Sequence, residues 1–92
     1  MKGIYMNITK TSAAGTLESN DVLITLRPNP ELGIEINLKS VVLKQFGKQI
    51  KAVILQTLET HNITSCIVDC EDKGALDYVI VARLESAIGR QT

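Results

Sequence analysis

Few residues of this 92-residue sequence have the chemistry of an active site. The only histidine is His61 and the only thiols are Cys66 and Cys70, which cannot complete a four-ligand zinc site. His61 stands apart from any nucleophile motif such as G-x-S-x-G, so no Ser-His-Asp triad is legible. Glycine-rich phosphate loops of the G-x-G-x-x-G or Walker type are also missing. The residue types therefore predict neither a catalytic residue nor a metal ligand.

The other titratable residues each have two interpretations. On a strand, Cys66 and Cys70 share one face, either as reduced, partly buried thiols or as a redox pair, and we favour the reduced thiols. His61 is either a helix-end residue favoured by the helix dipole or a general base, and we favour the helix end. Carboxylates gather at residues 18–21 and 69–72, where solvated turn charges are the simpler interpretation than an acid/base pair.

Ser19 is the remaining candidate. It lies between Glu18 and Asn20 in the stretch AAGTLESNDVLITL of residues 13–26, at the entrance to a strand-like alternation. Its hydroxyl either bonds nearby backbone, as serines in turns do, or stays accessible so that another enzyme can attach a group to it. The residue types alone leave both possibilities open.

The composition limits the elements that can position these residues. Residues 1–92 are expected to form one domain, whose 45% hydrophobic and 3% aromatic composition predicts an aliphatic core without a wide aromatic pocket. Ten acidic and ten basic residues cancel, which argues against a nucleic-acid partner. We find neither a secretory signal nor a window of about 20 apolar residues, so we expect no membrane association and a cytoplasmic location.

Periodicity predicts the first three elements. Alternating apolar residues indicate strands at 21–27 and 34–39, which we expect to pair as a hairpin around the turn PNPELG. From 41 to 60 the period becomes helical, with Ser40 as the N-cap and with Phe46 and Ile50 in the buried stripe. Gly47, inside this helix, predicts either close packing against a strand or a bend.

The second half predicts two further strands. They span 63–68 and 78–84 and are joined by the charged turn EDKGALD, in which Gly74 supplies a positive φ. The last residues continue that strand or form a short helix through Leu84 and Ile88, and we favour the helix. The predicted fold is a single small α+β domain with a mainly antiparallel sheet, in the order β-β-α-β-β with a possible short C-terminal helix. The long helix packs on one face of the sheet.

Four segments, in order and at matching intervals, resemble the citrate lyase acyl carrier protein, the gamma subunit of the citrate lyase complex. The segments are AGTLESND at 14–21, KQFGKQI at 44–50, DKGALD at 72–77 and ARLESAI at 82–88. Each is weak alone, but together they cover the chain from about residue 8 to residue 89. The family pattern begins nearer Met6, so residues 1–7 are expected to be an extension or disordered, with Met1 or Met6 as the native start.

The resemblance implies a carrier that is not itself an enzyme. Family members carry 2'-(5''-phosphoribosyl)-3'-dephospho-CoA, joined by a phosphodiester to the serine of GTLES, which is Ser19 here. The thiol of this group presents acetyl and citryl thioesters to the alpha subunit, a transferase, and the beta subunit, a lyase, which together cleave citrate to acetate and oxaloacetate. Further implied partners are a prosthetic-group transferase and an acetate ligase that acetylates the thiol. Glu18, Asn20 and Asp21 are expected to help the transferase recognise the turn.

Two rival functions remain possible, and the roles of two basic residues are undecided at this point. One rival is the carrier subunit of malonate decarboxylase, which uses the same prosthetic group, and the other is a structural or interaction domain without one. Lys73 and Arg83 either meet phosphates or an acidic partner surface, or are ordinary solvated charges.

Ordinary acyl carrier proteins are acidic helical bundles with Asp-Ser-Leu at a helix start, whereas this chain is neutral and strand-rich. Their fold is therefore not expected here.

Overall fold

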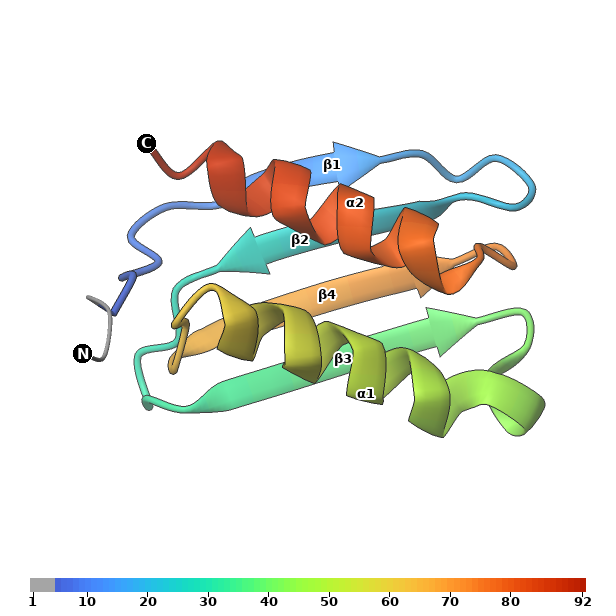
Figure 1. The fold of residues 1–92 in the computed structure, drawn as a ribbon, viewed down its shortest axis with the longest axis horizontal. Coiled ribbons are helices and arrows are strands. Elements are labelled where there is room, and N and C mark those ends of the chain that lie inside the picture. Colours follow the sequence, from blue (N-terminus) through green and yellow to red (C-terminus); the bar gives the residue numbers. More distant parts are fainter. Residues whose placement is uncertain (1–4) are drawn as a thin grey trace.

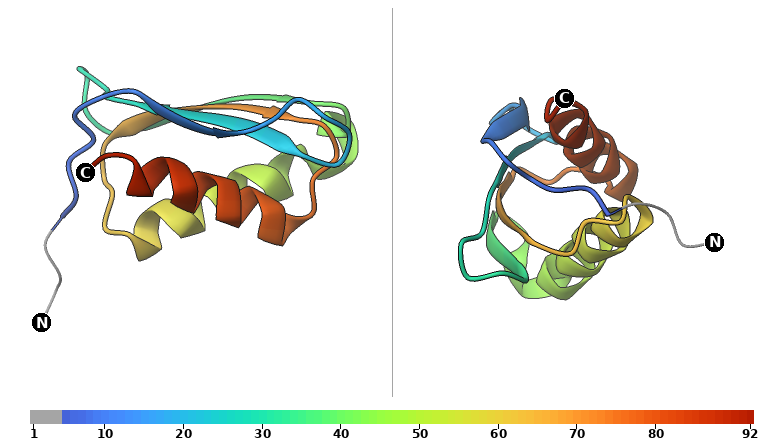
Figure 2. Two further views of the ribbon diagram at one scale, coloured as in Figure 1. Left: turned by 90° about the horizontal axis from the view of Figure 1, so that it is seen from above. Right: turned by 90° about the vertical axis from the view of Figure 1, so that its left-hand side faces the viewer.

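Two helices cover one face of a four-stranded sheet in the computed structural model, which describes residues 5–92 (Figures 1 and 2). The elements follow the chain as β1 (Ser12–Gly15), β2 (Val22–Arg27), β3 (Ile34–Ser40), α1 (Leu43–Thr60), β4 (Cys66–Asp72) and α2 (Asp77–Gly89). No helix within the described residues is long and apolar enough to span a lipid bilayer. The predicted α+β class is confirmed.

The sheet has the strand order β1-β2-β4-β3. Its β1–β2 and β2–β4 pairings are antiparallel, whereas β3 and β4 are parallel. The predicted hairpin of the strands at 22–27 and 34–40 is therefore wrong, because β4 lies between them. Parallel neighbours need a long crossover, and α1 supplies it between β3 and β4. Local turn chemistry in PNPELG could not reveal this insertion.

Three further differences separate the structure from the sequence prediction. Ser12–Gly15 forms a strand that was not predicted, and the strand expected at 63–68 spans Cys66–Asp72. Residues 78–84 belong to a helix rather than to a fourth strand. The buried residues of α2 are Ile80, Leu84, Ala87 and Ile88, which recur at helical spacing. The segment EDKGALD is accordingly no hairpin turn, because Glu71 and Asp72 end β4 and the rest leads into α2. The observed order is β-β-β-α-β-α.

Aliphatic side chains from β2, β4 and both helices meet between the sheet and the helices. Fully enclosed members include Val22, Ile24, Leu26, Ile54, Leu58, Val68, Ile80 and Leu84. Burial of this apolar surface, at about 25 cal/mol per Å², is the main stabilising contribution to such a fold. Ile50 joins the core as predicted, but the prediction for Phe46 is wrong, since its side chain is 48% exposed near the start of α1.

The start of α1 also differs from the expected cap. Val42 occupies the N-cap without a capping side chain, while the Ser40 hydroxyl accepts a hydrogen bond from Val42 N–H (3.0 Å). A Cβ on Gly47 would lie 3.0 Å from Leu43 Cδ1, so its close neighbour is a side chain of α1 and not a strand. Residues 1–7 were expected to be an extension or disordered, and the first four of them lie outside the described residues. Among the other three, Met6 N–H donates to Asn62 O (3.1 Å).

Candidate functional site

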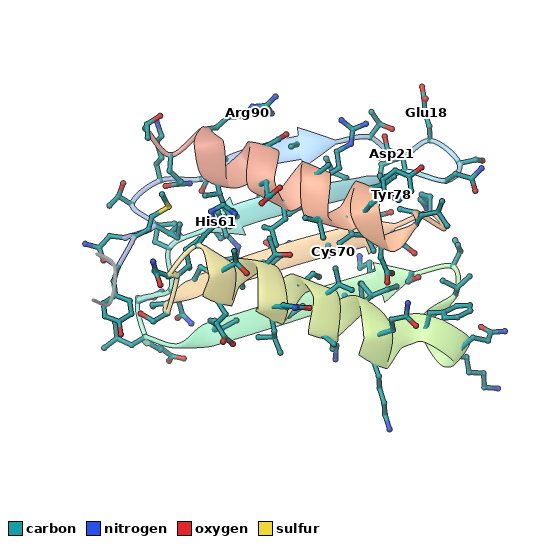
Figure 3. All side chains as sticks on the ribbon, in the orientation of Figure 1. Glu18, Asp21, His61, Cys70, Tyr78 and Arg90 are labelled. Atoms are coloured by element: carbon teal, nitrogen blue, oxygen red, sulfur yellow. The ribbon has the colours of Figure 1, made fainter. Side chains whose placement is uncertain are left out.

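Ser19 lies in the β1–β2 loop, residues 16–21, which projects from one end of the sheet (Figure 1). Ser19 is exposed, as are its neighbours Glu18 and Asn20. Figure 3 shows Glu18 pointing away from the sheet. Within the described residues, no hydrogen bond involves the Ser19 hydroxyl. Its oxygen is therefore available to another molecule.

Backbone geometry explains the shape of this loop. Gly15 ends β1 with φ +102°, and a Cβ there would lie 1.8 Å from Val22 O, so only glycine fits. Asp21 N–H donates to Glu18 O (3.1 Å) and closes a four-residue turn. The third residue of the turn, Asn20, has φ +66°, which asparagine tolerates better than most residues. Ser19 is the second residue, at the tip of the turn.

The Asp21 carboxylate holds the loop together. It accepts hydrogen bonds from Arg83 Nε (3.0 Å) and Nη2 (2.8 Å), from the Thr16 hydroxyl (2.7 Å) and from Val22 N–H (2.8 Å). The Arg83 guanidinium, followed by Thr16 and the Val22 amide, holds the pKa of the Asp21 carboxyl well below its ordinary value. We call these four residues the Asp21 anchor. The anchor ties the loop of Ser19 to α2.

The connection between β4 and α2 supports the same loop from its other side. Asn20 N–H donates to Lys73 O (2.8 Å), and Lys73 N–H donates to Asp21 O (2.9 Å). Gly74 follows with the predicted positive φ of +92°, and a Cβ on it would lie 3.7 Å from Asn20 Oδ1. The Lys73 ammonium lies 3.5 Å from Glu71 Oε2. Residues 73–74 thus lie directly beside the turn that carries Ser19.

The two basic residues with open roles are therefore placed differently. Arg83 forms a two-bond ion pair with Asp21 and has a 39% exposed side chain, so it is a paired charge at the surface rather than a free one. Lys73 stays near the protein surface beside Glu71. The pairing of Asp21 with Arg83, 62 residues later, carries no local signal that sequence reasoning could have used.

The acidic cluster at 69–72 has structural contacts. Asp72 is buried, accepts a hydrogen bond from the Ser40 hydroxyl (2.7 Å) and accepts another from Ala75 N–H (2.9 Å). Asp69 accepts a hydrogen bond from Arg27 Nε (2.7 Å), and this bond lowers the pKa of the Asp69 carboxyl. The expectation of solvated turn charges is therefore wrong for Asp69 and Asp72, which lie within β4. Asp72 holds the β4–α2 connection, and Asp69 joins β4 to β2.

The histidine and the cysteines lie away from the Ser19 loop. His61 follows the last residue of α1, as predicted, and its Nε2 lies 2.8 Å from Glu85 Oε2. Cys66 and Cys70 are free and buried in β4, as predicted. Burial raises the pKa of the Cys66 thiol to about 11, and burial together with the charge of Asp72 raises the pKa of Cys70 to about 12. Neither thiol is poised for nucleophilic chemistry.

Comparison with known proteins assigns the chain to a family. The family model described as malonate decarboxylase delta subunit (MdcD) matches residues 9–91. A citrate lyase acyl carrier protein from Halothermothrix orenii is 46% identical, with 92% of this chain and 89% of the relative covered. One from Haemophilus influenzae is 51% identical, with 95% and 90% covered. This chain belongs to the family of citrate lyase acyl carrier proteins. Membership of an acyl carrier family implies a covalently attached prosthetic group.

The fold of this chain resembles parts of solved structures of other proteins. A chain of a Pseudomonas malonate decarboxylase hetero-tetramer in complex with malonate superposes with a TM-score of 0.70 at 16% identity, covering 90% of this chain and 84% of that one. Homoserine kinase from Cytophaga hutchinsonii gives a TM-score of 0.56 at 13% identity, with 98% of this chain but only 38% of the kinase covered. At these identities the likeness concerns the fold alone.

Proposed function

We propose that this chain is the acyl carrier subunit of citrate lyase and that phosphoribosyl-dephospho-CoA is joined to it at Ser19. The observation that carries the proposal is the free, exposed hydroxyl at the tip of a firmly held turn. Ser86 is also exposed, but it lies within α2 rather than in a turn. Ser12 and Ser40 form structural hydrogen bonds, because Ser12 donates to Ala87 O (2.7 Å) and Ser40 donates to Asp72 Oδ2 (2.7 Å). Modification of either one would break a structural hydrogen bond.

The residues around Ser19 fit a large attached group. The Asp21 anchor and the backbone bonds to Lys73 hold the turn without any contribution from the Ser19 side chain. A phosphodiester at this hydroxyl therefore leaves every structural hydrogen bond of the loop intact. Glu18 and Asn20 flank the hydroxyl on the surface, where a transferase can contact them. Asp21 contributes to that recognition indirectly, because its carboxylate is committed to the anchor.

When bound, the prosthetic group supplies a terminal thiol that carries acetyl and citryl groups. The protein presents this arm from a fixed point, so that the alpha and beta subunits meet it at a high effective concentration. The chain itself makes and breaks no bond of citrate in this proposal. Ser19 is an attachment point, and the Asp21 anchor positions it.

The proposal also specifies partners and a compartment. Besides the alpha and beta subunits, the carrier meets a prosthetic-group transferase, which installs the arm, and an acetate ligase, which acetylates its thiol. We place these encounters in the cytoplasm.

Replacement of Ser19 tests the proposal, with Ser86→Ala as the matched control because Ser86 is also exposed. Each variant is produced in the native host or together with the transferase, and its intact mass and tryptic peptides are measured. We expect one adduct on the peptide containing Ser19 in the wild type and in Ser86→Ala, and none in Ser19→Ala. Citrate cleavage with the alpha and beta subunits falls to background for Ser19→Ala alone.

The free energy of unfolding of Ser19→Ala distinguishes a role of Ser19 in attachment from a purely structural role. Because its hydroxyl forms no hydrogen bond among the described residues, Ser19→Ala should change the free energy of unfolding by less than about 1 kcal/mol. A Ser19→Ala protein that supports full cleavage, or an adduct found on Ser12 or Ser40, would refute the proposal. A native protein without any adduct would instead favour the structural domain.

A carrier subunit of malonate decarboxylase is the second candidate. It is favoured by the description of the matching family model and by the superposition on the Pseudomonas hetero-tetramer. Relatives named citrate lyase acyl carrier protein, at 46–51% identity, support citrate lyase more strongly. Modified carrier mixed with the partner subunits of either complex distinguishes the two, and we expect turnover only of citrate. Turnover of malonate alone would reverse the assignment.

A further inference from the structure

Exposed apolar side chains gather at the end of the molecule that carries Ser19. Three connections meet there: the β1–β2 loop, the β4–α2 connection and the turn that leads into α1 (Figure 1). Among the described residues, ten large apolar side chains are exposed, and six belong to these connections or to the helix turns that follow them. The six are Leu17, Val41, Leu43, Phe46, Leu76 and Tyr78. Such a concentration marks a binding surface.

Part of this surface is hollowed into a groove between the first turns of α1 and the start of α2. Its volume is about 570 Å³, within the range of small-molecule sites. Phe46 and Tyr78 line it, and they are two of the three aromatic residues in the chain. Tyr78, labelled in Figure 3, is 70% exposed. These two exposed rings give a flat ligand a stacking surface.

The groove also has polar atoms. Gln49 Nε2 donates to Asp77 Oδ2 (2.9 Å), and both residues belong to the groove lining. A carboxylate has two oxygens and about four acceptor sites, so Asp77 can accept a further hydrogen bond from a ligand amine. Apolar rings beside a carboxylate suit a flat heteroaromatic base with an exocyclic amino group.

The groove is continuous with the loop of Ser19. Gly74 lines the groove and lies beside Asn20, next to Ser19 in the turn. Asn20 N–H also donates to the carbonyl of Lys73, the residue before Gly74. A group attached to Ser19 therefore starts one residue from Asn20's contact with the groove lining. A short flexible tether gives effective concentrations on the order of millimolar, so weak stacking suffices for occupancy.

We propose that this groove binds the adenine base of the dephospho-CoA group joined to Ser19, an inference that rests on the proposed function. The base stacks against Phe46 and Tyr78, and its amino group donates to Asp77. Docking of the base fixes the proximal part of the arm and leaves the distal, thiol-bearing part free to reach the partner subunits. The groove thereby sets the point from which the thiol is presented.

The test compares apo and modified protein by NMR, after mass spectrometry has established that the adduct is on Ser19. We expect nuclear Overhauser effects from the adenine protons to the rings of Phe46 and Tyr78. We also expect modification to shift the amide resonances of Ala75 and Tyr78 as well as those of the Ser19 loop. These signals do not depend on catalytic activity.

Two variants on α1 sharpen the test. Phe46→Ala removes one stacking surface, whereas Leu55→Ala removes a similarly exposed side chain, 45% against 48%, that is not part of this groove. We expect Phe46→Ala to lose the adenine contacts and the shift at Ala75, with the shifts around Ser19 unchanged. Leu55→Ala should keep all of them. Both side chains are half exposed, so both variants should fold.

The outcomes separate this inference from the function on which it depends. An adduct on Ser19 without adenine contacts, with shifts confined to residues 16–21, overturns the groove inference and leaves the carrier function standing. Groove resonances that shift only when the alpha or beta subunit is added also overturn it, in favour of protein docking. Absence of any adduct on Ser19 refutes the proposed function and the inference together.

Discussion

The loops at the two ends of β2 have the same length but are held in different ways. Each contains six residues, 16–21 before β2 and 28–33 after it. The second is stabilised mainly from within, because Asn29 donates to Gly33 O (3.1 Å) and accepts from the amides of Glu31 (3.0 Å) and Leu32 (3.3 Å). It needs few contacts elsewhere to keep its shape.

The loop of Ser19 also has internal hydrogen bonds, among Thr16, Glu18 and Asp21, but distant residues hold it as well. Arg83 of α2 and Lys73 of the β4–α2 connection supply these additional hydrogen bonds. This difference suits the proposed role of Ser19 as an attachment point. Because other residues hold the loop in place, the Ser19 hydroxyl at its tip needs no hydrogen bond within the protein. The difference also predicts that distant substitutions disturb the Ser19 loop and leave the 28–33 loop unchanged.

The largest expected effect comes from replacing the glycine at one boundary of each loop, Gly15 before the first loop and Gly33 at the end of the second. Gly15→Ala places a Cβ 1.8 Å from Val22 O at φ +102°, which should cost about 3 kcal/mol or more of unfolding free energy. Gly33→Ala has φ +91° but no atom within 4 Å, so it should cost only about 1–2 kcal/mol. Urea denaturation of both variants checks this. Equal losses would contradict the close approach at Gly15.

A smaller effect is expected from the Asp21 anchor. Arg83→Met removes the ion pair with Asp21 but keeps an apolar side chain, and it should slow modification of Ser19 by about tenfold or more, because a loosened turn presents the hydroxyl less often in the productive geometry. Arg27→Met is the control, since Arg27 is similarly exposed but pairs with Asp69. The rate of mass gain with the transferase measures both. An unchanged rate in Arg83→Met would show that the anchor does not position Ser19.

The smallest effect concerns acid stability. The folded pKa of Asp21 is depressed, so the stability that its charge contributes is present at neutral pH. That contribution is lost as the pH falls below the ordinary Asp range, near 4, toward the folded pKa. Asp21→Asn lacks it, so denaturation midpoints should fall less between pH 5 and about pH 2 in the variant than in the wild type. Parallel curves for the two proteins would argue against the anchor.

Local patterns in the sequence predicted the parts of the fold that depend on neighbouring residues. The alternation in Val22–Arg27 and Ile34–Ser40 indicated strands, and the helical period through Thr60 indicated α1. The left-handed conformation of Gly74 was predicted from its turn. These features need only information from a few adjacent positions, and for this reason periodicity and turn chemistry were sufficient.

Other expectations failed where packing decides between local alternatives. Residues 78–84 are apolar enough for a strand or a helix, and their position against β1, β2 and α1 selects the helix. Phe46 has the spacing of the apolar residues that α1 buries. However, the buried part of α1 begins only at Gly47, so the ring of Phe46 is half exposed. Both errors arose because burial depends on which elements lie opposite.

By itself, the sequence determined the aliphatic core, the α+β class, the long helix and, through four family-like segments, the serine to examine. Only the tertiary structure decided that β4 separates β2 from β3 and that Arg83 forms an ion pair with Asp21. It also decided that Phe46 and Tyr78 line one groove near the Ser19 loop. The physical reason is sequence separation. These contacts join residues tens of positions apart, and they form only when the whole chain packs around one core.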